Sequence, residues 1–193
     1  MLISTSRRRR WVVLLGALTA VLAFSTSASA ERSLFFEETA EAFWSVPHTC
    51  ADGSTVEATL LVRATRDFES PDTEDADPTA RLQYLAVCPD GTSFSWVAII
   101  PATITSANNL KKVTASGTGI ARDNLGGTHE VTFDVTWTAV GPLLTTVNGP
   151  GSKRQQREAT ATGQVTFDGD VLVNGEANHP TRPAPFIRVD TEK

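Results

Sequence analysis

The two cysteines are the residues of this sequence whose chemistry is easiest to predict. Cys50 and Cys88 are the only cysteines, and each precedes a short Asp-Gly turn sequence, at 51–54 and at 89–92. Each also ends an alternating run on its apolar side, so the two would meet inside one end of the fold. An even count in an oxidising compartment favours a disulfide, and two cysteines without CxxC spacing or an adjacent histidine make a poor metal site. We therefore predict a Cys50–Cys88 disulfide.

An acidic segment at 67–77 is the candidate metal site. It contains Asp67, Glu69, Asp72, Glu74, Asp75 and Asp77. Calcium takes six to eight oxygen ligands, which such a segment could supply, but the glycine and the distal glutamate of an EF-hand are missing. A hydrated loop without metal is the alternative. If calcium binds, we expect Asp72, Asp75 and Asp77 to hold it, and no other cofactor is predicted.

The histidines offer only a weak case for catalysis. His48, His129 and His179 show no HxH or HExxH spacing, and the chain has no GxSxG motif around a serine nucleophile. His129 begins a strand-like run beside a glycine-rich turn, where it could be a base, a metal ligand or a hydrogen-bonded strand end. The sequence leaves open whether the protein is an enzyme, and it favours a protein without catalytic activity. A cleft that holds His129 beside a carboxylate would support a secreted hydrolase.

Alternation of apolar and polar residues predicts β-strands along most of the chain. It is clearest at 131–138, where Val131, Phe133, Val135 and Trp137 share one side. Turn sequences such as Asp-Gly separate the runs. The predicted strands cover 40–49, 55–66, 80–88, 92–100, 110–121, 128–139, 155–167 and 170–177, and a ninth lies near 185–190.

Short strands joined by tight turns predict an all-β fold. We expect an antiparallel β-sandwich or an open barrel of about eight strands with one disulfide. Residues 40–193 should form a single domain, with 31–39 as an N-terminal tail or a short helix. The tryptophans at 44, 96 and 137 fall on apolar sides and are predicted core residues. Phe43 and Phe68 are left as the visible aromatic candidates for sugar binding.

The first 30 residues read as a secretory signal peptide. Arg7 to Arg10 form its charged part, Val12 to Phe24 its apolar part, and Ala28-Ser29-Ala30 its cleavage site. The apolar part is short for a membrane span, although a retained signal anchor is the alternative. Cleavage after Ala30 would leave 163 of the 193 residues with a formal charge of −9, because four of 17 basic residues and none of 22 acidic residues lie in the signal.

Several consequences follow for localisation and partners. We predict secretion into the medium or periplasm, with no stable membrane anchor after cleavage. The acidic charge argues against nucleic acid or an anionic membrane as partner, since both need a positive patch. The partner is unknown, and carbohydrate and protein stay open as ligand classes.

Several motifs occur in an order typical of one group of proteins. They are Thr49-Cys50, the stretch 87–91, the stretch 133–143 and the stretch 157–165. In these the chain resembles uncharacterised small secreted β-rich proteins that are common in actinobacteria and other soil bacteria. The resemblance implies the fold and an extracellular location and carries over no catalytic residue. Our first hypothesis is therefore an extracellular binding or structural module. The hydrolase and a calcium-dependent adhesion module are the alternatives.

Overall fold

The structure is a computed structural model that describes residues 34–70 and 77–192. The chain divides into two compact units, Met1–Glu31 and Arg32–Lys193, and all described residues belong to the second. The predicted signal peptide at 1–30 therefore lies outside the described residues.

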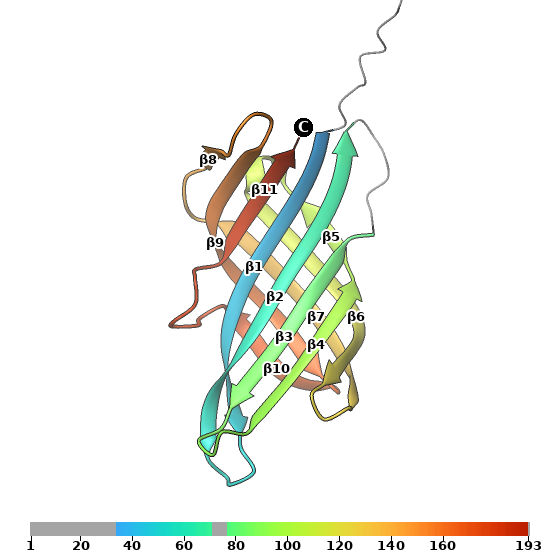
Figure 1. The fold of residues 1–193 in the computed structure, drawn as a ribbon, viewed down its shortest axis with the longest axis vertical. Helices are drawn as coiled ribbons and strands as arrows, with labels where there is room; N and C mark the ends of the chain where they lie inside the picture. Colours follow the sequence, from blue (N-terminus) through green and yellow to red (C-terminus); the bar gives the residue numbers. More distant parts are fainter. Residues whose placement is uncertain (1–33, 71–76, 193) are drawn as a thin grey trace, which may run out of the picture. The chain divides into compact units, whose positions relative to one another are not determined.

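Almost every described segment is a β-strand (Figure 1). The strands are β1 (Leu34–Thr49), β2 (Thr55–Ser70), β3 (Thr79–Val87), β4 (Ser93–Pro101), β5 (Thr103–Ser106), β6 (Lys112–Asp123), β7 (Thr128–Ala139), β8 (Leu144–Val147), β9 (Lys153–Phe167), β10 (Asp170–Glu176) and β11 (Phe186–Glu192). A single 3₁₀ turn, Asn108–Leu110, is the helical element among the described residues.

All strand pairs are antiparallel and belong to one sheet. The antiparallel all-β prediction is confirmed. The pairings run from β1 through β2, β3, β4, β6, β7 and β9 to β11, and β11 pairs back with β1. The sheet therefore closes into a barrel, because β11 supplies the pairing that an open barrel or a sandwich lacks.

The first strand begins earlier than the sequence indicated. Residues 34–39 belong to the segment 31–39 that we expected to be a tail or a short helix, but they form the start of β1. Glu38 shares the inward side with Ala40, and it hid the apolar alternation there. It is nevertheless buried, because Arg66 on β2 pairs with it. A paired charge can occupy an interior position that an unpaired one could not. The short strands β5 and β8 were also not predicted.

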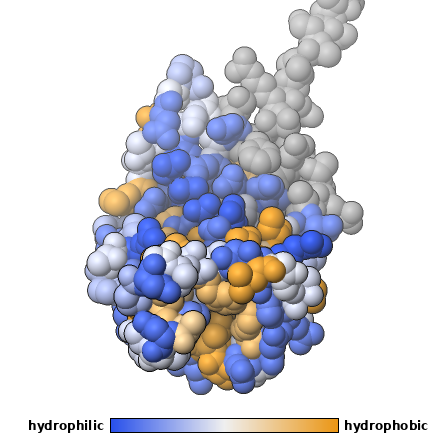
Figure 2. Space-filling model, turned by 60° about the horizontal axis from the view of Figure 1, so that its bottom comes forward, coloured by the Kyte–Doolittle hydropathy of each residue, from blue (hydrophilic) through white to orange (hydrophobic). Residues whose placement is uncertain are grey.

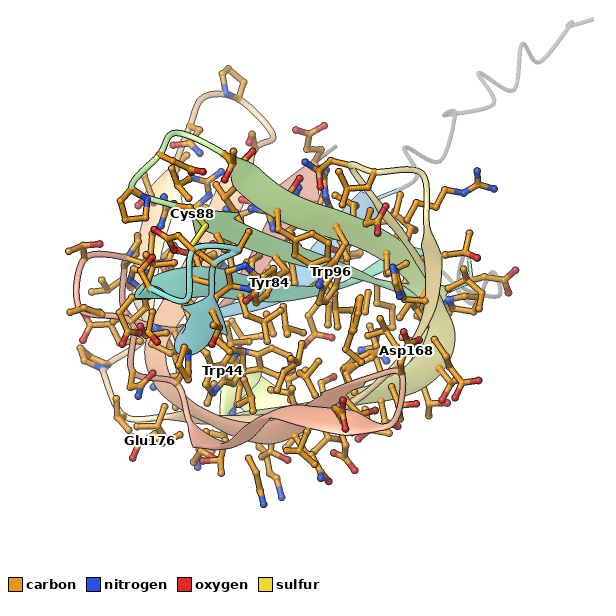
Figure 3. All side chains as sticks on the ribbon, turned by 90° about the horizontal axis from the view of Figure 1, so that it is seen from below. Trp44, Tyr84, Cys88, Trp96, Asp168 and Glu176 are labelled. Atoms are coloured by element: carbon orange, nitrogen blue, oxygen red, sulfur yellow. A yellow bond between two sulfur atoms is a disulfide. The ribbon has the colours of Figure 1, made fainter. Side chains whose placement is uncertain are left out.

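The inward side chains fill the barrel. Trp44, Trp96 and Trp137 are 2%, 2% and 0% exposed, which confirms that they are core residues. Trp44 and Trp96 are seen inside the ring in Figure 3. An eight-stranded barrel has an interior just wide enough for side chains, so large rings here alternate with small residues. Gly163 shows how close the packing is, since a Cβ there would lie 2.5 Å from the carbonyl oxygen of Asp134.

Four hairpin turns lie at one end of this barrel. They are the turns β1–β2, β3–β4, β6–β7 and β9–β10, which follow from the antiparallel register of the ring. Two of them are the Asp-Gly turns that follow the cysteines. This end, at the bottom of Figure 1, carries the candidate chemistry described next.

Candidate functional site

A disulfide joins the β1–β2 turn to the β3–β4 turn. Cys50 and Cys88 are bonded, with their Cα atoms 6.0 Å apart, as predicted. The two turns have the same hydrogen bonds: in each, the cysteine N–H donates to the residue four positions on, and the aspartate accepts from the residue two positions on. The hydroxyl and then the N–H of Ser54 donate to Asp52, and those of Thr92 donate to Asp90, and these bonds lower the pKa of both aspartates. We call the Cys50–Cys88 bond, which ties these two turns together, the disulfide clamp.

His48 stands beside the disulfide clamp without completing a metal site. Its ring lies within 4.8 Å of both sulfur atoms, which is metal-ligand spacing. The sulfurs are bonded to each other, however, so neither is a thiolate ligand. Nδ1 of His48 is 3.1 Å from the hydroxyl of Tyr84, and burial raises the pKa of Tyr84 to about 12. His48 therefore packs as part of the barrel end.

His129 lies between two aspartates at the same end of the barrel. Its Nε2 is 2.9 Å from Asp123, at the end of β6, and its Nδ1 is 2.7 Å from Asp168, in the β9–β10 turn. The other oxygen of each carboxylate accepts backbone N–H groups, from Gly127 and Glu130 respectively. We call Asp123, His129 and Asp168 the ionic clamp, because they tie two turns together.

The protonation of the ionic clamp follows from its geometry. A carboxylate only accepts hydrogen bonds, so a histidine between two carboxylates must donate from both nitrogens and carry a positive charge. The hydrogen bonds to Asp123 and Asp168 accordingly raise the pKa of His129, and the same bonds lower the pKa of both aspartates. Both ring nitrogens are engaged, so neither is placed to accept a proton from a nucleophile.

A row of aromatic rings connects the two clamps. His48 stacks on Phe94 at 5.7 Å between ring centroids, and Tyr84 packs edge-on against Phe94. Tyr84 stacks on Trp96 at 5.7 Å. Phe167 stacks on Trp96 at 5.2 Å and on His129 at 4.4 Å. These rings close the barrel at this end, and each aromatic contact adds to the area buried.

The acidic segment is described only in part. Asp72 and Asp75 lie outside the described residues, and Asp77 is exposed. Burial, followed by the nearby charge of Glu37, raises the pKa of Asp67. Calcium binding at Asp72, Asp75 and Asp77 therefore stays a prediction.

At the opposite end of the barrel lies a buried ion pair that the sequence did not indicate. Glu38 and Arg66 are 2.7 Å apart, with side chains 4% and 22% exposed. Arg66 also donates to Ser106. A cavity of about 260 Å³ adjoins the pair, and Asn109 and Leu110 line it. The two charges neutralise each other, so this cavity presents no net charge to a ligand.

The outer face of β1–β4 carries a groove of about 380 Å³. Phe43, Leu61, Gln83 and Val97 are directly paired across the four strands, and Leu85 lies next to this row. Their neighbours along each strand face inward, so these side chains face outward. Leu85 is 45% exposed and Val97 is 38% exposed. We call this feature the outer groove.

The loop between β10 and β11 forms one wall of the outer groove. His179 bonds to the Thr59 hydroxyl at 2.9 Å, and Asn178 accepts from the Ser45 N–H at 3.2 Å. The Arg182 guanidinium lies 5.7 Å from the centre of the Phe43 ring, within cation–π range. Phe43, a candidate for sugar binding, is thus half-buried under this loop, while the side chain of Phe68 lies outside the described part.

Comparisons with known proteins found no match among family models, curated proteins or solved structures. In the described part of the chain, no helix is long and apolar enough to cross a membrane. The resemblance to small secreted β-rich proteins stays a prediction.

Proposed function

We propose that this chain is a secreted bacterial binding module and that the outer groove is its ligand site. Export is supported by the signal-like residues 1–30, with cleavage after Ala30, and by the disulfide clamp. Disulfides persist in oxidising compartments outside the cytosol. The proposal agrees with the resemblance to small secreted β-rich proteins of soil bacteria.

The exposed apolar floor of the outer groove carries this proposal. Leu61, Leu85 and Val97 form the floor, and polar groups such as Thr59 and Gln83 surround it. An apolar patch rimmed by polar residues is typical of an interaction site, and small-molecule pockets begin at roughly 300 Å³. Figure 2 shows hydrophobic side chains exposed between hydrophilic ones on the surface of the barrel. Because side chains fill the interior, the outer surface is where a ligand can bind.

The ionic clamp weighs against the hydrolase alternative. His129 does lie within hydrogen-bond reach of carboxylates, as that alternative required. Its two nitrogens are both bonded to them, so the histidine ties turns together instead of facing a substrate. Binding without catalysis is therefore the function we propose.

The groove can be tested with Nile red, a neutral dye that fluoresces in apolar sites. We expect the mature protein to bind the dye and Leu85→Asp to weaken binding by about tenfold, which is roughly 1.4 kcal/mol. Val171→Asp is the matched control, because Val171 is 54% exposed on β10 and does not line the groove. Equal melting temperatures would show that both variants fold. Dye binding that Leu85→Asp leaves unchanged would contradict the proposal.

Export has its own test. The full chain, expressed in a bacterial host, should appear in the periplasm or medium with Glu31 as its first residue. Mass spectrometry of the intact protein would detect this N-terminus. A protein that keeps residues 1–30 would count against secretion as a soluble module.

A further inference from the structure

We infer that the outer groove binds a single amphiphile with an apolar chain and an anionic head group, carboxylate or phosphate. This inference rests on the proposed function and adds the chemical class of the ligand. The observation behind it is that arginines surround the groove, although the chain as a whole is acidic.

Three arginines surround the apolar floor. Arg182 lines the groove from the β10–β11 loop. Arg122 on β6 is the register partner of Val97, so it lies on the same outer face. Arg81 on β3 is the register partner of Ile99, one row further along that face. Arginine approaches the groove from three separate elements.

These three arginines have no acidic partner among the described residues. Most arginines elsewhere are paired with acids: Arg66 with Glu38, Arg154 with Asp190, and Arg188 with both Glu37 and Asp190. Arg157 has no acidic partner, but its guanidinium donates to the carbonyl oxygens of Asn109 and Gly141. Arg63, which faces Arg81 across the strands, is paired with Glu41. Among the described arginines, those whose guanidinium has neither an ion pair nor a hydrogen bond therefore lie around the groove, where a ligand can supply an anion.

Nearby acidic groups cancel only part of this charge. Glu41 is paired with Arg63, whereas Glu57, which accepts from the Ser45 hydroxyl, and Glu130, the register partner of Ile120, keep their charges, so three arginines face two free carboxylates. The chain as a whole has a formal charge of −5, so a positive rim is a local feature. A guanidinium binds carboxylate or phosphate through two parallel hydrogen bonds. Recognition of an anionic head group follows from this chemistry.

The floor requires that the rest of the ligand be apolar. Beyond the groove, Ile99 and Ile120 are 68% and 56% exposed, and they continue the apolar surface between Arg81 and Arg122. A purely polar anion would leave this surface in water. A volume of about 380 Å³ suits one small molecule, whereas a stable protein partner buries roughly 800 Å² on each side. The negative charge of the chain disfavours an anionic bilayer.

Decanoate and decan-1-ol, measured by displacement of Nile red below micelle concentrations, provide the test. They share one chain length and differ in the charge of the head group. For the mature protein we expect decanoate to bind at least about tenfold more tightly, with the difference shrinking in high salt. Arg122→Gln and Arg182→Gln should each remove much of this preference and leave the affinity for decan-1-ol unchanged.

Controls keep the outcomes separable. Arg154→Gln removes an arginine that is paired with Asp190, and it should leave the preference intact. Arg182→Lys keeps the charge next to Phe43 and should retain part of the preference. Equal affinity for both compounds would overturn this inference and leave the proposed function standing, whereas binding of neither would count against both. If the protein binds vesicles of anionic phospholipid but not decanoate, the groove is a membrane-binding face and the inference is wrong. If the protein forms a dimer that Leu85→Asp dissociates, the groove is an interface with a second copy, and the inference is again wrong.

Discussion

Two clamps at one end of the barrel perform the same mechanical task with different chemistry. The disulfide clamp ties the β1–β2 turn to the β3–β4 turn, and the ionic clamp ties the β6–β7 turn to the β9–β10 turn. The first depends on redox conditions and not on pH, whereas the second depends on pH and not on redox conditions. The comparison shows that a barrel end can be held closed both by a covalent bond and by charge.

The two clamps also differ in what they connect. The disulfide clamp links two successive hairpins across a separation of 38 residues. The ionic clamp links the β6–β7 turn to the β9–β10 turn, and three strands, β7, β8 and β9, separate the two turns in the chain. It includes Asp168, which has φ of +50°. The aromatic row from His48 to His129 fills the space between them. Four experiments test this comparison.

Removal of the disulfide should have the largest effect. For a loop of 38 residues, the chain-entropy model gives about 4 kcal/mol of lost stability. Urea unfolding of Cys50→Ser/Cys88→Ser, and of the wild type with and without a dithiol reductant, would measure it. A loss below about 1 kcal/mol would show that the aromatic row and the ionic clamp hold this end without the covalent bond.

Loss of the ring that joins the two clamps should cost less. Phe167 stacks on both Trp96 and His129 and is half-buried. We expect Phe167→Ala to lower the free energy of unfolding by about 2 kcal/mol, below the range for a fully buried phenylalanine. Phe167→Leu, which keeps apolar volume, should recover about half. An unchanged urea midpoint in both variants would mean that this ring does not support the barrel end.

The ionic clamp should give stability that depends on pH. The pKa of His129 is raised above 6.5, so its contribution is present in full below pH 6.5 and is lost as pH rises through the raised value. The pKa values of Asp123 and Asp168 are lowered below 3.8, so their contribution is present above pH 3.8 and is lost as pH falls through the lowered values. The clamp therefore stabilises most between about pH 4 and pH 6.5.

His129→Gln tests this window. The difference in unfolding free energy between wild type and variant should be largest near pH 5 to 6 and shrink by pH 9. Titration of the His129 ring by NMR would confirm the direction of its pKa shift. Cys50→Ser/Cys88→Ser is the control, because its loss of stability should not follow the same pH dependence. A difference that grows from pH 6 to pH 9 would contradict the doubly bonded histidine.

The smallest expected effect is the coupling between the clamps. They share no residue, and several rings separate them, so the losses from His129→Gln and from the two serine substitutions should add to within about 0.5 kcal/mol at pH 6. The triple variant completes the cycle. A coupling above about 1 kcal/mol would show that the aromatic row transmits strain from one clamp to the other.

Much of the fold could be predicted from the sequence. Alternation in 128–139 located β7 with both of its ends correct, and similar patterns located most other strands. It failed where an interior position holds a charge, as at Glu38, and where a strand has only four residues, as in β5 and β8. In these cases the pattern was too short or was interrupted by a paired acidic residue.

The candidate sites were harder to predict for a related reason. The apolar residues of the outer groove, such as Leu61 and Val97, occupy outward positions on four different strands and show no common spacing. The ionic clamp joins His129 to Asp168, which is 39 positions away. A turn signal marked Asp168, but nothing in the chain indicated which histidine it would meet.

By itself the sequence determined the periodicity of the strands, the positions of the turns and the cysteine pair, because these depend on neighbours along the chain. Only the tertiary structure decided that β11 closes the ring, that His129 is held between two carboxylates, and that unpaired arginines surround an apolar groove. Such features depend on which strands become neighbours, and strand order is set by the packing of the whole barrel and not by any local pattern.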